Sequence, residues 1–147
     1  MLSIIRSVSQ LDVEQLQHVY GAYSYSDFYE SIVAFFEEPK TYIYLWQVNG
    51  RYVSALRIEP FENGWLVAGL ETALAERRKG YAKTLLSAVI DQLPDNTTVY
   101  SHIHITNKPS LAVHAACGFS EYLDYARLLD GSISINYYTY KKTTPMR

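Results

Sequence analysis

Three consecutive cations, Arg77, Arg78 and Lys79, stand directly before Gly80 and the apolar helical pattern that follows it. The N-terminal end of a helix already carries roughly half a positive charge and several amide N–H groups without partners, so further cations are locally unfavourable there. A bound phosphate would resolve this conflict, because the amides, the helix dipole and the cations would share one anion. The alternative is a solvated basic turn, since short basic clusters are common on protein surfaces.

The overall charge restricts where an anion site can occur. The chain has 147 residues, of which 13 are Lys or Arg and 15 are Asp or Glu, so its formal net charge is −2. A negative net charge and a short cation cluster argue against nucleic acid or an anionic membrane as a partner. Any anion site is therefore local.

The length and the 48% hydrophobic content predict a single domain over residues 1–147, without a linker, a repeat or a low-complexity segment. No apolar run approaches the roughly 20 residues that span a bilayer. The first residues, MLSIIRSVSQLD, lack the features of a signal peptide, and the single Cys117 cannot form an internal disulfide. We therefore expect a cytoplasmic protein.

Hydrophobic periodicity predicts the elements that precede the cation cluster. A short strand, SIIRSV, comes first; a helix over LDVEQLQHVY follows with Asp12 as its N-cap, and a second helix opens with a cap at Ser26 and stops before Pro39. Residues 41–73 then predict three antiparallel strands, because apolar side chains alternate and Asn49-Gly50 and Glu62-Asn63-Gly64 are turn signals.

The elements after the cluster complete a mixed sheet. An apolar stripe from Tyr81 to Leu93 predicts a helix, and TTVYSHIHIT predicts a strand that lies parallel to its predecessor. A short helix with Pro109 in its first turn and Gly118 as its stop precedes a closing hairpin around Asp130-Gly131. The predicted order is β-αα-βββ-α-β-α-ββ, an α/β fold with helices on both sides of the sheet.

Two motifs resemble those of the GCN5-related N-acetyltransferases, the GNAT family. The family pattern of Arg or Gln, two residues, Gly, one residue, and Gly or Ala is matched by Arg77-Arg78-Lys79-Gly80-Tyr81-Ala82. The family's fourth motif, an Asn followed by a short helix and a closing Gly-Phe, is matched by Asn107, Ser110, His114, Gly118 and Phe119. The resemblance implies the GNAT fold, with a mostly antiparallel sheet of about seven strands. It also implies an acetyl-CoA-dependent N-acetyltransferase that moves an acetyl group to a primary amine by direct attack in a ternary complex.

The resemblance further implies how the cosubstrate acetyl-CoA is held. Backbone amides from Arg78 to Lys83 would wrap its diphosphate, and the main chain of the preceding strand would pair with its pantetheine arm and stabilise the developing oxyanion. Asn107 would help to hold the cosubstrate, cap the short helix, or do both. No metal is expected. The expected cofactor-binding residues are Leu70, Glu71, Thr72, Arg77, Arg78, Lys79, Gly80, Tyr81, Ala82, Lys83 and Asn107.

Acetyl transfer to an amine needs a base for the ammonium and an acid for the departing thiolate. By alignment with the family, His102 is the candidate base, although a histidine on a strand can equally be structural. His114 stands where the family most often has the Tyr that acts as general acid; it can donate a proton, stabilise the thiolate or simply pack. Glu71 is the third candidate, either as base or ammonium anchor in the pocket or as a solvent-facing residue. His104 is expected only to line the pocket or to support it, and Cys117 to be a small core residue.

The acceptor amine is not selected by the sequence: a small amine, an amino acid, an antibiotic and a protein N-terminus all remain open. The two first helices carry aromatic residues that can hold an aryl or cationic amine or pack onto the sheet. These residues are Tyr20, Tyr23, Tyr25, Phe28 and Tyr29.

The missing Tyr at position 114 favours an alternative function, that of a non-catalytic acyl-CoA sensor or assembly module on the same fold. In addition, the Tyr-rich last strand, SINYYTY, can serve as a homodimer surface.

Overall fold

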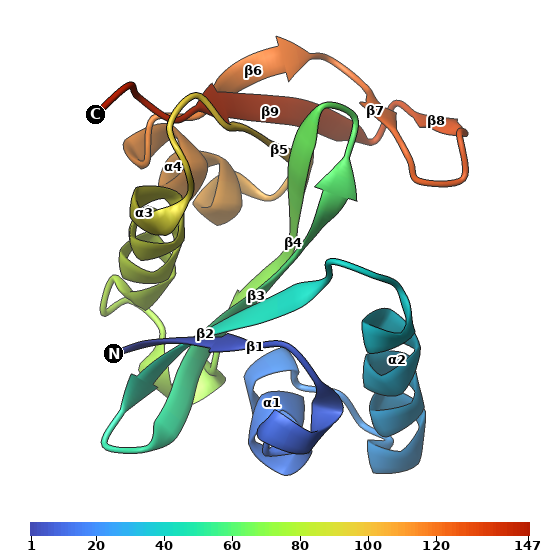
Figure 1. Cartoon of the computed structure of the whole chain (residues 1–147), viewed down its shortest axis with the longest axis vertical. Helices are drawn as coiled ribbons and strands as arrows, with labels where there is room; N and C mark the ends of the chain where they lie inside the picture. The colour runs from blue at the N-terminus through green and yellow to red at the C-terminus, as the bar shows by residue number, and fades with distance from the viewer.

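The computed structural model describes residues 1–147 and contains a seven-stranded mixed sheet between two helical layers (Figure 1). The strands follow one another across the sheet in the order β1-β2-β3-β4-β5-β9-β6. All neighbours are antiparallel except β4 and β5. These strands are β1 (Leu2–Ile5), β2 (Tyr42–Val48), β3 (Arg51–Phe61), β4 (Gly64–Thr72), β5 (Thr98–His104), β6 (Ser120–Leu123) and β9 (Tyr137–Thr143).

The helices cover both faces, which confirms the predicted α/β architecture. Figure 1 shows α1 and α2 on one side of the sheet and α3 and α4 on the other. No helix combines the length and the hydropathy that a membrane span requires. The bounds are α1 (Val13–Tyr20), α2 (Tyr25–Glu37), α3 (Tyr81–Gln92) and α4 (Lys108–Ala116), with short 3₁₀ helices η1 (Val8–Gln10) and η2 (Leu74–Glu76).

Two hydrophobic clusters, one on each face, hold these layers together. The cluster under α3 contains Leu85, Leu86 and Val89 from that helix, and the cluster under α1 and α2 contains Leu16 and Ile32. Strand β2 serves both, because its successive side chains point to opposite faces. The central strands are therefore covered on two sides, as their apolar sequence indicates.

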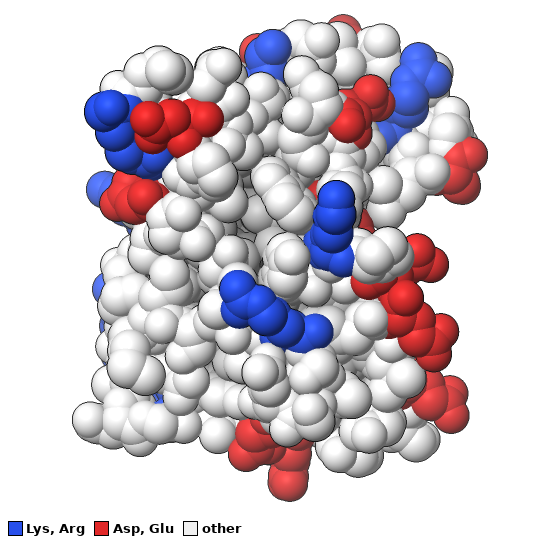
Figure 2. Space-filling view, viewed as in Figure 1, with Lys and Arg blue, Asp and Glu red and all other residues white.

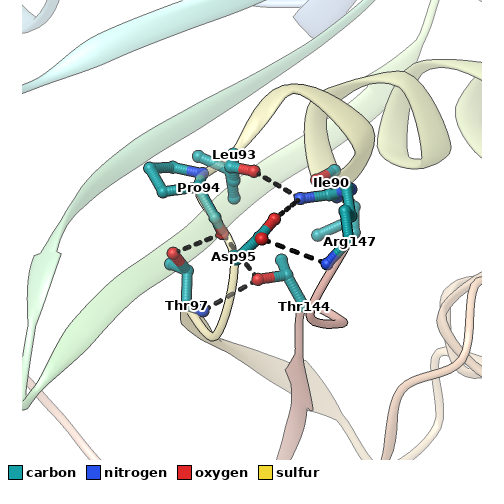
Figure 3. A network of polar contacts seen from close by, with 7 residues as sticks. All are labelled: Ile90, Leu93, Pro94, Asp95, Thr97, Thr144 and Arg147. Carbon is teal, nitrogen blue, oxygen red and sulfur yellow. Dashed lines mark hydrogen bonds and ion pairs between the residues drawn. The ribbon is translucent and has the colours of Figure 1, made fainter.

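Helix α3, whose N-terminal end follows the cation cluster, is anchored at its other end by Arg147 (Figure 3). The guanidinium donates to the carbonyl oxygens of Leu93 at 2.9 Å and Ile90 at 3.3 Å, and it lies 3.0 Å from Oδ1 of Asp95. A cation at the C-terminal end satisfies carbonyls that have no partner within the helix and complements the helix dipole.

Two local predictions differ from the structure. Helix α2 begins at Tyr25 and its N-cap is Ser24, not Ser26: Ser24 is extended, and its Oγ accepts from the Asp27 amide at 3.3 Å. The closing hairpin is also interrupted, because the segment around Asp130-Gly131 forms its own two-stranded sheet from β7 (Ala126–Arg127) and β8 (Ile133–Ser134). The turn at Asp130-Gly131 is present as predicted, but which strands pair beside it depends on tertiary packing.

Candidate active site

Strands β4 and β5 are paired only at one end, which opens the sheet between them. Their parallel register covers Trp65 with Val99, Leu66 with Tyr100, and Val67 with Ser101. Beyond this point β4 continues to Thr72 and pairs only with β3. An extended strand without a neighbour presents main-chain groups along its open edge, where an extended ligand can pair.

A β-bulge lies on β4 just past the point where the two strands separate. Arg57 faces Ala68 and Ala55 faces Glu71, so β4 has one residue more than β3 in this interval. Gly69 has φ +60°, the left-handed region in which glycine is favoured. Past the bulge, side chains hold two carbonyls of β4: Ser54 Oγ donates to that of Glu71 at 2.7 Å, and Arg77 Nε donates to that of Thr72 at 3.2 Å.

The turn before α3 forms an anion cradle. Gly80 is the N-cap at φ +82° and no side chain caps the helix, so the amides of the first turn have no capping partner. Arg78 is also left-handed, at φ +67°, and a turn with left-handed residues can bring backbone N–H groups together around an anion. A Cβ placed on Gly80 would meet no atom within 4 Å and would project into open space. The cradle therefore fits a phosphate.

A pocket of about 610 Å³ joins the cradle to the open edge of β4. Every predicted cofactor-binding residue except Lys79 lines it. The other lining residues, which the prediction did not include, are Glu76, Pro109, Ser110 and Val113.

Glu76 organises the basic turn. It is only 8% exposed, and its carboxylate lies 2.7 Å from Arg51 Nη2 and 2.9 Å from Lys79 Nζ. These partners, chiefly the hydrogen bond from Lys79, hold the pKa of Glu76 below its ordinary value. The only sequence signal for this pairing was the three-residue spacing between Glu76 and Lys79.

The three cations of the turn therefore have different surroundings. Lys79 is paired with Glu76, and Arg77 Nη2 lies 3.7 Å from Glu71. Arg78 forms no ion pair and no side-chain hydrogen bond with the rest of the protein. Arg78 is thus the cation of the cluster whose charge is not compensated at the pocket.

Asn107 is the N-cap of α4, since its Oδ1 accepts from the Ser110 amide at 3.2 Å. The capping role is confirmed. Asn107 also lines the pocket, and the amide nitrogen of its side chain carries two further donors. The cap and a contact with a ligand are compatible in this arrangement.

His102 lies at the fork of the sheet, one residue after the last pair between β4 and β5. Because strand side chains alternate, His102 points away from Val99 and the α3 cluster, to the sheet face that carries α1 and α2. Its ring packs edge-on against that of Phe61, with 5.2 Å between the ring centroids. Its Nε2 is buried without a hydrogen-bond partner, and burial lowers the pKa of His102. It lines a second pocket of about 190 Å³, separate from the first, with Phe61, Glu62, Tyr100, Tyr122, Leu123, Arg127 and Thr139.

His114 is inside the α3–α4 layer, 1% exposed, and does not line the main pocket. Its Nδ1 lies 2.8 Å from the Ser110 carbonyl, which can only accept, so Nδ1 carries a proton. Nε2 is buried and has no partner. Burial lowers the pKa of His114, although the Ser110 carbonyl opposes this effect. The neutral ring therefore has a free lone pair on Nε2, while a proton for donation from Nε2 requires the cationic form.

The remaining candidates differ in exposure. The Glu71 side chain is about half exposed at the pocket, next to Arg77. His104 is held by Thr106, whose Oγ1 lies 2.8 Å from its Nδ1, and it packs against Tyr137. Cys117 is partly buried against the α3 cluster, and its Sγ lies 3.4 Å from Ser87 Oγ.

The aromatic residues of the first two helices divide into two groups. Tyr20 and Phe28 pack against the α1–α2 cluster, whereas Tyr23, Tyr25 and Tyr29 are exposed. Figure 2 shows acidic side chains gathered along the edge that α2 forms. Helix α2 contains no Lys or Arg. Its exposed acidic residues are Asp27, Glu30 and Glu37, and the exposed Glu38 follows directly after the helix.

A forked mixed sheet with an uncapped helix N-terminus beside the fork is suited to a long, phosphate-bearing ligand that lies along the strand edge. A family model described as the acetyltransferase (GNAT) family matches residues 5–119. The chain therefore belongs to the GNAT family and is an acetyl-CoA-dependent acyltransferase. No curated protein sequence matches it.

Solved structures share the whole fold at low sequence identity. One is the ribosomal-protein-S18-alanine N-acetyltransferase from Escherichia coli, at 16% identity and TM-score 0.70, covering 100% of this chain and 96% of that one. An aminoglycoside 6′-N-acetyltransferase complexed with coenzyme A has 12% identity, TM-score 0.72, and coverage of 100% and 98%. Spermidine N-acetyltransferase from Vibrio cholerae, in complex with CoA and spermine, has 12% identity, TM-score 0.73, and coverage of 97% and 95%.

Proposed function

We propose that the protein transfers the acetyl group of acetyl-CoA to a primary amine, which attacks the thioester directly in a ternary complex. The observation that carries this proposal is the single pocket that joins the uncapped N-terminus of α3 to the open edge of β4. Its two parts match two adjoining parts of the cosubstrate: an anion cradle for the diphosphate, and a strand edge for the amide-containing pantetheine arm.

Cosubstrate binding is assigned to the residues that line this pocket. The amides of Tyr81, Ala82 and Lys83 would hold the diphosphate, with Arg78 supplying charge that no protein carboxylate neutralises. The main chain of Leu70 and Thr72 would pair with the pantetheine arm. An amide N–H at the bulge would stabilise the charge that develops on the thioester oxygen during attack.

His102 is proposed as the base. It lies at the fork of the sheet, where a thioester arm along β4 would end, and on the face opposite α3. Because burial lowers its pKa, the imidazole is neutral at pH 7 and can take the proton of an incoming ammonium, directly or through water. Glu71 remains a second candidate, as base or as an anchor for the ammonium.

His114 is proposed as the acid for the coenzyme thiolate: it does not line the pocket itself, but Ser110 and Val113 of the same helix do. Its orphaned Nε2 is a hydrogen-bonding position that the protein itself leaves empty. A nearby thiolate would raise the pKa of this histidine by charge attraction, which favours the cationic form that can protonate the leaving group.

The acceptor is proposed to be cationic before it loses its proton, in keeping with the acidic edge of α2 and the exposed tyrosines beside it. The matching structures suggest a test panel: spermidine, an aminoglycoside, a peptide that begins with alanine, and a free amino acid.

The test is thiol release from acetyl-CoA with each amine, for the wild type, His102→Ala and His114→Ala. The proposal expects turnover with at least one amine, and variants that lose turnover while they retain coenzyme A binding. Binding without turnover for every amine would instead favour the alternative, a non-catalytic acyl-CoA sensor. The buried, neutral His114 at the position of the usual Tyr is the observation that keeps this alternative in view.

A further inference from the structure

The tyrosine that ends α1 makes a polar contact with the main chain of β4 across the layer boundary. Tyr20 Oη donates to the carbonyl oxygen of Gly69 at 2.6 Å, a short hydrogen bond. Burial raises the pKa of Tyr20, so its hydroxyl retains the proton at any working pH. The ring itself packs against Phe28 and the α1–α2 cluster.

This contact falls on the β-bulge beside the pocket. Gly69 is the left-handed residue of the bulge, and a Cβ placed on it would lie 3.0 Å from Arg57 Nε and 3.3 Å from Tyr20 Oη. The glycine is thus enclosed on the α1 side. The next residue, Leu70, lines the main pocket.

The geometry of one peptide unit connects the α1 side of the bulge with its pocket side. The Gly69 carbonyl and the Leu70 N–H belong to one planar trans peptide unit, so they point in opposite directions. A hydroxyl that holds this carbonyl on the α1 side therefore turns the Leu70 N–H away from α1. A bulge is the part of a ladder where such a peptide can rotate most easily, because the extra residue has no cross-strand partner.

We propose that Tyr20 is a positioning residue for acetyl transfer: its hydroxyl fixes the Gly69–Leu70 peptide so that the Leu70 N–H faces the thioester oxygen. This inference rests on the proposed function. Tyr20 does not touch the substrate in this scheme; it acts through the peptide that it orients. Removing the hydroxyl allows the peptide to rotate, which reduces stabilisation of the transition state more than binding of the cosubstrate.

Tyr20→Phe tests this, because it keeps the ring and removes only the hydrogen bond. Tyr52→Phe is the matched control: Tyr52 Oη accepts from the Asp12 amide at 3.0 Å in the same cluster, away from the bulge. With the panel amine that is acetylated best, Tyr20→Phe should lower kcat about tenfold while the KM for acetyl-CoA changes less than twofold. Tyr52→Phe should leave kcat within twofold of the wild type.

A second readout does not need turnover. In ¹⁵N-labelled protein without ligand, Tyr20→Phe should shift the Leu70 amide resonance and accelerate its hydrogen exchange, and Tyr52→Phe should do neither. An unchanged Leu70 amide, or an unchanged kcat in Tyr20→Phe, overturns the inference. If the wild type acetylates no amine, the proposed function fails and the catalytic part of this inference fails with it, while the Leu70 signals still decide whether Tyr20 orients the peptide.

Discussion

The ammonium of Lys79 lies 2.9 Å from Oε2 of Glu76, so one of the three cations before α3 is neutralised within the protein. Glu76 also binds Arg51 from β3 and thereby ties the basic turn to the sheet. Lys79 therefore helps to shape the turn, whereas Arg78, which has no ion pair in the protein, is available to a ligand.

Arg78→Gln should therefore weaken coenzyme A binding more than Lys79→Gln. We expect a loss of about tenfold for Arg78→Gln, the size of one charge-assisted hydrogen bond, and less than threefold for Lys79→Gln. Calorimetric titration at low and high salt checks this, because the difference between wild type and Arg78→Gln should shrink as salt screens the phosphate contact. A larger loss in Lys79→Gln would contradict the division of roles.

Gly80→Ala should weaken coenzyme A binding by at least tenfold, because its methyl group would project into the cradle that the diphosphate needs. The left-handed backbone, at φ +82°, should also cost about 1 kcal/mol of stability. Gly50→Ala is the matched control: Gly50 has φ +77° and open space at its Cβ, but lies in the β2–β3 turn. Equal effects of both variants on binding would show that the cradle is not the anion site.

Glu76→Gln should lower the thermal midpoint at pH 7 and lose this effect in acid. The folded-state pKa of Glu76 is lowered, so its stabilising contribution is complete above the ordinary Glu pKa of about 4.3 and disappears as the pH falls through the lowered value. The midpoints of wild type and variant should thus converge as the pH falls below about 4.3 and through the lowered pKa of Glu76. Glu30→Gln, at an exposed position of α2 without an ion pair, should match the wild type throughout.

The pH profile of kcat/KM should report His102 as the base. Burial lowers the pKa of His102, so activity should rise with pH through a midpoint below about 6.5, the ordinary histidine value. His102→Gln should remove this limb and reduce kcat by roughly a hundredfold or more. If His102→Gln kept the same rising limb of the pH profile, the base would be another group, with Glu71 as the next candidate.

Local sequence signals were sufficient for much of the fold. Asp12 caps α1 as predicted, and Asn49 and Gly50 both take positive φ in the turn they indicate. Such features depend on a few neighbouring residues and on the 3.6 and 2.0 residue periods. The cap of α2 was misassigned because two serines, Ser24 and Ser26, compete within three positions.

The residue pattern was sufficient to predict the order of the main elements, the family resemblance and the glycine turn before α3, because each depends on residues that are close together in the sequence. The fork between β4 and β5, the pairing of Glu76 with both Lys79 and Arg51, and the bond from Tyr20 to Gly69 appear only in the folded chain. The last joins residues 49 positions apart. Contacts of this kind depend on which faces of the helices and strands meet when the core is buried, and no local pattern records that choice.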